Sequence, residues 1–151
     1  MKKTDWNYWK EFYIKRKTDH ANFIINKIEA EGLTPIENIT FLELKEYTMG
    51  FPYMELVVSP QFKIDKYTVD FYIYHEPTDT KIIVECDGHD FHEKTKEQAA
   101  HDKTRDRFFT IYGYYLLRYT GSQICSNPEE ITQNIDEILV PQIEKLRKLN
   151  A

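Results

Sequence analysis

Alternation of apolar and polar residues in the middle of the chain predicts three consecutive strands. The segments MELVVSPQFKI (54–64), YTVDFYIYH (67–75) and TKIIVECD (80–87) are rich in β-branched and aromatic residues, which suit the half-buried surface of a sheet. The residues HEPTD (75–79) predict a hairpin turn between the second and third strands. A fourth strand, YYLLRYT (114–120), is expected further along, followed by a turn at Gly121-Ser122.

Helical spacing appears on both sides of these strands. Three helices are expected over residues 35–47, 91–111 and 128–149, because Thr34-Pro35 and Asn127-Pro128 are start signals and Gly113 is a stop signal. The buried face of the last helix is expected to carry Ile131, Ile135, Ile138 and Leu139. The order helix, three strands, helix, strand, helix predicts an α/β protein.

The N-terminal segment also has a helical pattern. Trp6, Trp9 and Tyr13 lie near helical spacing and neither Gly nor Pro interrupts residues 5–30, so a helix is expected there, with a break near Thr18. Its tryptophans are expected to pack on the core. Because residues 1–27 carry seven Lys or Arg against three Asp or Glu, a DNA-binding arm and an exposed interaction patch are the alternatives.

Composition narrows the class of protein. The 151 residues suit one domain, and 41% hydrophobic with 30% charged residues is ordinary for a globular chain. No apolar run approaches the roughly 20 residues of a membrane span, and the N-terminus lacks a signal peptide, so a cytoplasmic protein without a membrane partner is expected. A net charge of −5 argues against coating nucleic acid by electrostatics alone. Cys86 and Cys125 form neither a disulfide framework nor a zinc site.

Carboxylates in the strands are the strongest chemical signal. Asp70 interrupts an otherwise apolar, aromatic or Thr run from Tyr67 to Tyr74, and a buried charge is costly unless something pairs with it. Glu85 and Asp87 point to one face of the next strand, because side chains alternate along a strand. Each acid alone fits a salt-bridged surface group, but together they predict a site where Mg²⁺ sits between repelling carboxylates and binds substrate phosphates.

The helix after these strands carries candidate nucleic-acid contacts. Lys103 and Arg107 are spaced i and i+4, while Gln98, Asp102, Arg105 and Phe109 share another stripe. Phosphate binding by these cations and an ordinary solvated helix face are equally consistent with the pattern. His89 and His92 precede the helix, and the roles of general acid, phosphate contact and surface residue all remain open for them.

Five segments carry a family resemblance. TPIEN, YTVDF, KIIVECDGHDFH, QAAHDKTRDRFF and GYYLLRYTGSQI resemble the PD-(D/E)XK nuclease superfamily, specifically its very-short-patch-repair-like branch, over roughly residues 34–128. The resemblance implies a restriction-endonuclease-like core over 34–128 within a single domain. A helical extension (1–33) precedes this core and a C-terminal helix (129–151) follows it.

The resemblance also assigns roles. Glu37 becomes the acid of the leading helix, Asp70 the central metal-binding aspartate and Glu85 the second acidic ligand. Asp87 stands where the superfamily has a lysine, so Gln98 or Lys103 is expected to supply a polar group in its place. The implied cofactor is Mg²⁺, with Mn²⁺ as a substitute, held by Asp70, Glu85, Asp87 and the backbone carbonyl of Cys86.

The cysteine and histidine zinc set of the mismatch-repair nickases is absent, so no structural zinc is expected. The implied function is therefore a general or restriction-type endonuclease, in restriction, repair or defence against mobile elements. Its expected substrate is nucleic acid, DNA rather than RNA, contacted by His89, His92, Lys103, Arg105 and Arg107, and a homodimer is compatible with the sequence. The alternatives are a catalytically silent nucleic-acid-binding domain and a protein-interaction domain with structural acids.

Overall fold

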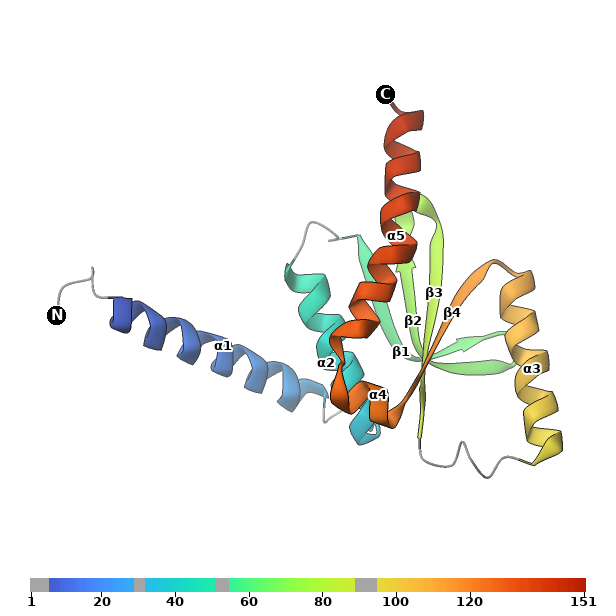
Figure 1. Ribbon diagram of the computed structural model, residues 1–151, viewed down its shortest axis with the longest axis horizontal. Coiled ribbons are helices and arrows are strands. Elements are labelled where there is room, and N and C mark those ends of the chain that lie inside the picture. Colours follow the sequence, from blue (N-terminus) through green and yellow to red (C-terminus); the bar gives the residue numbers. More distant parts are fainter. Residues whose placement is uncertain (1–5, 29–31, 51–54, 89–94) are drawn as a thin grey trace. The chain divides into compact units, whose positions relative to one another are not determined.

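The computed structural model describes residues 6–28, 32–50, 55–88 and 95–151 (Figure 1). The chain divides into two compact units, Met1–Thr34 and Pro35–Ala151. This division falls next to the end of the helical extension expected over residues 1–33. Among the described residues, no helix has both the length and the apolar character needed to cross a membrane.

The first unit contains one helix, α1 (Trp6–Ile28). The break expected near Thr18 is wrong, since α1 is continuous. The Thr18 hydroxyl donates a hydrogen bond to the backbone oxygen of Ile14 at 2.9 Å, so its hydrogen-bonding capacity is met within the helix. Large side chains along α1 remain exposed, among them Tyr13 and Phe23. The side chains of Trp6 and Trp9 lie outside the described set, so their expected packing stays a prediction.

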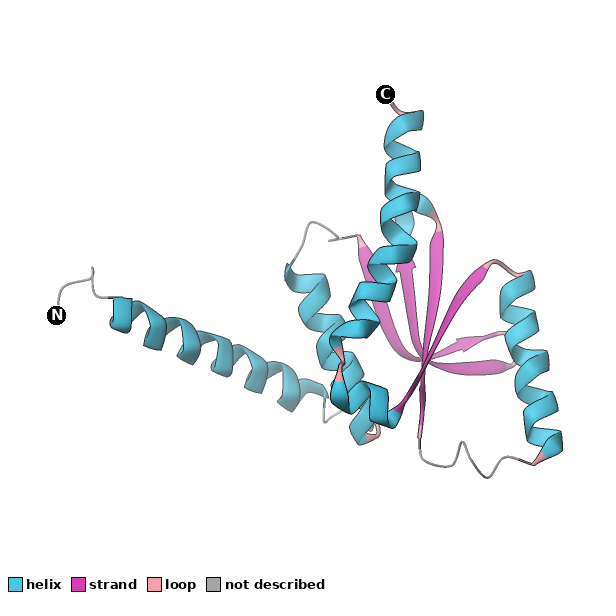
Figure 2. Ribbon diagram, viewed as in Figure 1, coloured by secondary structure: helices cyan, strands magenta, loops and turns pink. Residues whose placement is uncertain are grey.

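The second unit is an α/β layer structure, as the order of elements predicted. Its elements are α2 (Pro35–Gly50), β1 (Leu56–Ile64), β2 (Tyr67–His75), a 3-10 turn (Glu76–Thr78), β3 (Thr80–Asp87), α3 (Lys96–Ile111), β4 (Tyr114–Thr120), α4 (Gly121–Ser126) and α5 (Glu129–Leu149). The sheet has the order β1-β2-β3-β4, with antiparallel pairing except between β3 and β4, which are parallel. In Figure 2, α2, α4 and α5 lie on one side of this sheet and α3 on the other.

Two boundaries differ from the sequence-based expectation. The turn expected at Gly121-Ser122 is the start of α4, because Thr120 and Gln123 form a reciprocal capping box in which Thr120 Oγ1 accepts from the Gln123 backbone at 3.3 Å. The helix expected over 91–111 begins at Lys96, where Thr95 and Gln98 form a second capping box. Residues 91–94 lie outside the described residues.

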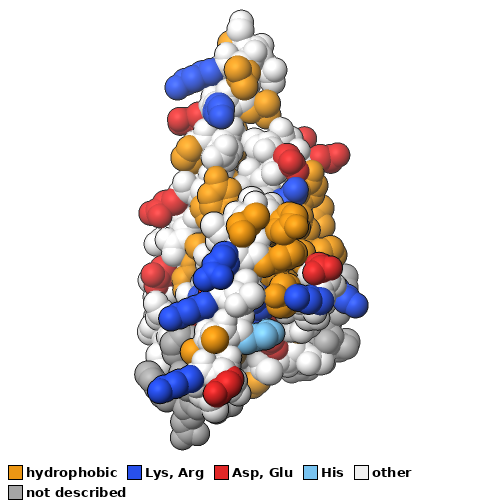
Figure 3. Space-filling view, turned by 90° about the vertical axis from the view of Figure 1, so that its right-hand side faces the viewer, with side chains coloured by type: hydrophobic (Ala, Val, Ile, Leu, Met, Phe, Trp, Pro, Cys, Tyr) orange, Lys and Arg blue, Asp and Glu red, His pale blue; other side chains and the backbone are white. Residues whose placement is uncertain are grey.

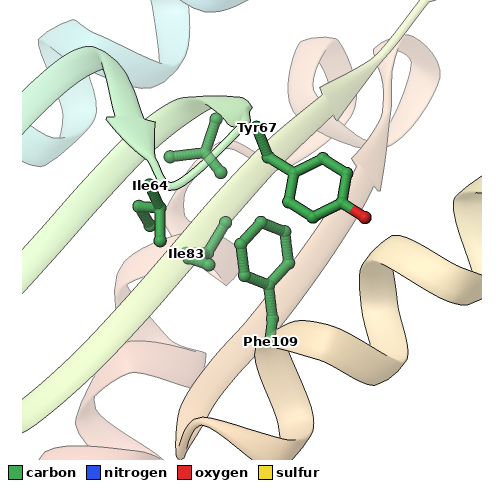
Figure 4. Packing of buried hydrophobic residues seen from close by; sticks show 5 residues of the cluster. Ile64, Tyr67, Ile83 and Phe109 are labelled. Carbon is green, nitrogen blue, oxygen red and sulfur yellow. The ribbon is translucent and has the colours of Figure 1, made fainter.

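The hydrophobic core lies on both faces of the sheet. On the α3 side, Ile64, Tyr67, Val69 and Ile83 pack around the fully buried ring of Phe109 (Figure 4). On the other side, α5 buries Ile131, Ile135 and Leu139, while Ile138 is only partly buried. Burial on both faces fixes the register of the central strands, since a one-residue slip would exchange their faces. The acids of β2 and β3 are therefore held in defined positions.

Candidate active site

Two carboxylates meet where β2 and β3 run side by side. The ladder between these strands begins with Phe71 opposite Val84, so Asp70 and Glu85 lie at the same end of it. Glu85 is only 5% exposed, and Asp70 Oδ2 accepts a hydrogen bond from the backbone N–H of Cys86 at 2.7 Å. Burial raises the pKa of Asp70, and the nearby charge of Glu37 adds to this rise, although the hydrogen bond from Cys86 opposes it. Asp70 is thus partly buried, with other acids close by.

Glu85 shows the same conflict more strongly. Burial, followed by the charge of Asp70, raises the pKa of Glu85 to about 8. Arg105 of α3 donates from Nη2 to Glu85 Oε1 and favours the charged form. The ion pair with Arg105 lowers the pKa of Glu85, whereas burial and Asp70 raise it. The pKa is raised overall, because one cation does not offset both desolvation and a neighbouring acid. If both were ionised, Asp70 and Glu85 would carry more negative charge than Arg105 neutralises, so the site favours a proton or a further cation.

Glu37 is the third acid of this cluster and comes from the first turn of α2. Its Oε1 accepts a hydrogen bond from Gln61 Nε2 at 3.0 Å. Gln61 reaches it from an irregular point of β1, where its φ of 46° is in the left-handed region. Three separate elements, α2, β2 and β3, thus bring Glu37, Asp70 and Glu85 together.

Asp87 lies two residues beyond Glu85 but is bound differently. Arg118 of β4 donates hydrogen bonds to both carboxylate oxygens of Asp87, with Nη2 at 2.7 Å from Oδ1 and Nε at 3.0 Å from Oδ2. Arg118 Nη1 also donates to Asp106 Oδ1 of α3 at 3.1 Å. The hydrogen bond with Asp87 raises the pKa of Arg118 further. Asp87 therefore ties β3, β4 and α3 together through one guanidinium.

The structure places the remaining candidates elsewhere. The Gln98 side chain accepts from the backbone N–H of Thr95 at 2.8 Å and so serves the N-terminal cap of α3. The Cys86 thiol donates to Thr40 at 3.3 Å, and burial raises its pKa to about 12, which keeps it neutral. Lys103 and Arg107 are exposed on α3, as a phosphate contact requires. His89 and His92 lie outside the described residues.

Arg105 departs from its expected exposed position as a nucleic-acid contact. Its guanidinium is 5.5 Å from the centre of the Phe109 ring and donates to the backbone oxygen of Thr68 at 3.3 Å, in addition to its contact with Glu85. Its buried Nε has no hydrogen-bond partner. Arg118 was missed from the sequence altogether, although a single charge in the strand YYLLRYT is the same signal that identified Asp70.

Carboxylate oxygens are ligands that a hard cation prefers, but the site does not form a complete set of metal ligands. Among the described residues, no group of three His, Cys, Asp or Glu side chains is arranged to hold a metal ion. Two carboxylates are nevertheless a common protein contribution to Mg²⁺, which keeps waters and substrate phosphates as its other ligands. The negative charge that Asp70 and Glu85 carry when both are ionised is what such an ion would neutralise.

Comparison with known protein families gives a match over more than half of the chain. The model of a restriction endonuclease family, REase_MTES_1575, matches residues 53–139, from the segment before β1 to Leu139 in α5. This match supports the PD-(D/E)XK superfamily and includes Asp70, Glu85 and both arginines. Searches of curated proteins and of solved structures found no match.

Proposed function

Because the chain belongs to the restriction endonuclease family REase_MTES_1575, we propose that it is a metal-dependent endonuclease that hydrolyses phosphodiester bonds of DNA. The observation that carries this proposal is the pairing of the partly buried Asp70 with the buried Glu85, because burial and a neighbouring acid, Glu37 for Asp70 and Asp70 for Glu85, raise the pKa of each. Such a pair is unfavourable for stability alone, since two unit charges about 4 Å apart repel by roughly 4 kcal/mol at an effective dielectric constant of 20. A catalytically silent domain has no physical need for it.

Asp70 and Glu85 would hold the divalent ion, Mg²⁺ or Mn²⁺, with the backbone carbonyl of Cys86 as a further ligand. Asp87 would join them only after Arg118 releases one of its oxygens. When bound, the ion would polarise a phosphoryl oxygen and make a bound water more acidic. Gln61 holds the Glu37 carboxylate beside this place.

The positive charge of the missing lysine is supplied, in this proposal, by Arg105. Its contact with Glu85 puts a guanidinium, with a side chain that is 15% exposed, next to the carboxylates. Gln98 is less suited, because its amide oxygen is occupied in the α3 cap. Lys103 and Arg107 are exposed on the same helix and would bind the DNA backbone.

The segment Glu85-Cys86-Asp87, with an acid in the lysine position, is similar to the very-short-patch-repair-like branch. We place the chain near that branch as a restriction-type enzyme acting in restriction, repair or defence against mobile elements. The alternative, a silent nucleic-acid-binding domain, predicts binding without cleavage.

Incubation with supercoiled plasmid, single-stranded DNA and RNA tests the proposal, each with Mg²⁺, Mn²⁺ or EDTA. Asp70→Asn should lower the cleavage rate by more than about 100-fold. Loss of a residue that only orients a metal ligand costs up to about 100-fold, and loss of the ligand itself should cost more. Asp65→Asn is the matched control, because Asp65 is exposed with a φ of 54°, a conformation that Asn also adopts readily. Undiminished cleavage by Asp70→Asn, or in excess EDTA, would overturn the proposal.

A further inference from the structure

A row of aromatic rings continues from the acidic site along β2. Tyr72 and Tyr74 follow Asp70 at alternate positions and so share its face of the strand. Their rings stack with centroids 6.3 Å apart and an interplanar angle of 12°. Phe62 of β1 stacks on Tyr72 at 4.7 Å and 18°, and Tyr114 of β4 meets Tyr72 edge-on at 6.2 Å. We call Phe62, Tyr72, Tyr74 and Tyr114 the aromatic row.

The aromatic row is partly open to solvent. Phe62 is 38% exposed and Tyr74 is partly exposed. Tyr72 and Tyr114 are also partly exposed, while their inner sides pack against the core around the fully buried Phe109. Tyr112, which caps the end of α3, is 63% exposed and contacts Phe108. Figure 3 shows the side of the molecule that carries α3, where hydrophobic side chains (orange) gather at the surface.

A cation lies next to the row, because Lys81 Nζ is 5.9 Å from the centre of the Tyr114 ring. Lys81 Nζ is also 3.8 Å from Asp79 Oδ1, and Asp79 accepts from the Tyr74 hydroxyl at 3.2 Å. Lys103 and Arg107 are exposed on α3, which lies on the same side of the sheet. Partly exposed rings with cations near them suit a ligand that has flat apolar bases and a negatively charged backbone.

We propose that the aromatic row is a platform on which unpaired bases of a single-stranded nucleic acid stack, with its backbone passing Lys81, Lys103 and Arg107. This inference rests on the proposed function and names the form of its substrate beside the site. Base pairs in an intact duplex hide their faces from such rings, so the row would engage a strand only where it is single or has been opened. The strand would then run along β2 toward Asp70.

The test is binding in EDTA, which keeps cleavage from interfering. The probes are a fluorescent single-stranded DNA of mixed sequence, the same backbone with abasic sites, and a duplex. Tyr74→Ala should weaken single-strand binding by about tenfold, within the range for loss of one stacked base. Tyr74→Phe should bind like the parent protein, because the ring is kept. Tyr115→Ala is the matched control, since Tyr115 is 42% exposed on the opposite face of β4, where it accepts from Gln142 of α5.

Salt dependence separates stacking from charge. Tyr74→Ala should leave the slope of affinity against salt unchanged, whereas Lys103→Gln with Arg107→Gln should reduce the slope by about 0.7 for each single-strand phosphate that the protein no longer binds. Circular dichroism of each variant checks that it is folded. Equal binding by Tyr74→Ala and Tyr115→Ala, or equal binding of abasic and normal strands by the parent, would overturn the platform. A dimer of the parent protein that Tyr74→Ala dissociates would instead assign the row to contacts between copies.

The two proposals fail separately. Asp70→Asn removes cleavage in the proposed function but retains the aromatic row, so it should bind single strands like the parent protein. Loss of single-strand binding in Asp70→Asn equal to that in Tyr74→Ala would count against a distinct platform. A parent protein that cleaves no substrate yet binds single strands through Tyr74 would overturn the proposed function alone.

Discussion

Glu85 and Asp87 are two carboxylates on one strand, two residues apart, and each contacts an arginine, yet their surroundings differ. Asp87 has both oxygens bonded to Arg118, which also reaches Asp106. Glu85 contacts Arg105, but it also faces Asp70, and burial with this like charge raises its pKa to about 8. An arginine nearby is therefore not enough to identify a structural acid, because burial and the other charges nearby also set the pKa of the carboxyl group.

This difference suggests a division of labour. Both sets have two acids and one arginine. In the Asp87–Arg118–Asp106 set, Arg118 bonds both acids and Asp106 is 37% exposed, so the set joins β3, β4 and α3 without a further cation. In the Asp70–Glu85–Arg105 set, Arg105 contacts Glu85, and Glu37 adds a third acid beside Asp70. The second set gains from an added cation, so it is the place for a metal, while the first keeps the surrounding elements in register.

The largest expected effect is on metal-dependent behaviour. Glu85→Gln should lower the cleavage rate by more than about 100-fold. In the parent protein, Mg²⁺ at about ten times its dissociation constant should stabilise the fold by about 1.4 kcal/mol, a rise of roughly 3 to 6 °C in melting temperature. Glu85→Gln should lose most of this rise, and Asp87→Asn should keep most of it. Thermal melts with Mg²⁺ and with EDTA measure both, and equal losses in the two variants would contradict the division.

A smaller effect is expected on stability without metal. Arg118→Met leaves Asp87 and Asp106 without their shared cation, and because the Arg118 side chain is 21% exposed, we expect about 3 kcal/mol of destabilisation, the low end for breaking a buried pair. Arg105→Met should cost only about 1 kcal/mol, since Glu85 with a pKa of about 8 mostly holds a proton at neutral pH and leaves little uncompensated charge behind. Urea unfolding in EDTA at neutral pH gives both values. A greater loss for Arg105→Met would reverse the comparison.

The sequence was enough to predict the strands and the acids, for a physical reason. Buried strands are nearly free of charge, so a single Asp70 in YTVDFYIYH, or two acids closing KIIVECD, stands out without any structure. The partners of these acids could not be read in the same way, because Arg105 and Arg118 come from elements 20 and 31 positions away in sequence. Their pairing depends on how α3 and β4 pack.

Local signals failed where two readings of the same residues compete. Gly121-Ser122 is a turn signal, but the capping box of Thr120 and Gln123 makes it the first turn of α4. Thr18 lowers helix propensity, yet bonds inside α1. Gln98 shares a stripe with Arg105, which suggested a place in the site, but it lies in the first turn of α3 and closes the cap.

The smallest expected effect, the pH dependence of stability in EDTA, separates Glu85 from Asp87 without any nuclease assay. Glu85 has an ordinary pKa of 4.5 and a folded-state pKa of about 8. Between these values the folded protein binds a proton that the unfolded chain has released, so the free energy of unfolding should fall as pH rises through this window. The stabilisation is fully present below about pH 4.5 and lost above about pH 8.

The slope from this one group is at most about 1.4 kcal/mol per pH unit, and the raised pKa of Asp70 adds to it in the same direction. Urea unfolding at several pH values between 5 and 8 should show the slope in the parent protein and in Asp87→Asn, but a much flatter curve in Glu85→Gln, which cannot titrate at that position. Parallel curves for Glu85→Gln and the parent would mean that Arg105 keeps Glu85 ionised throughout, and Glu85 would then be as well balanced as Asp87.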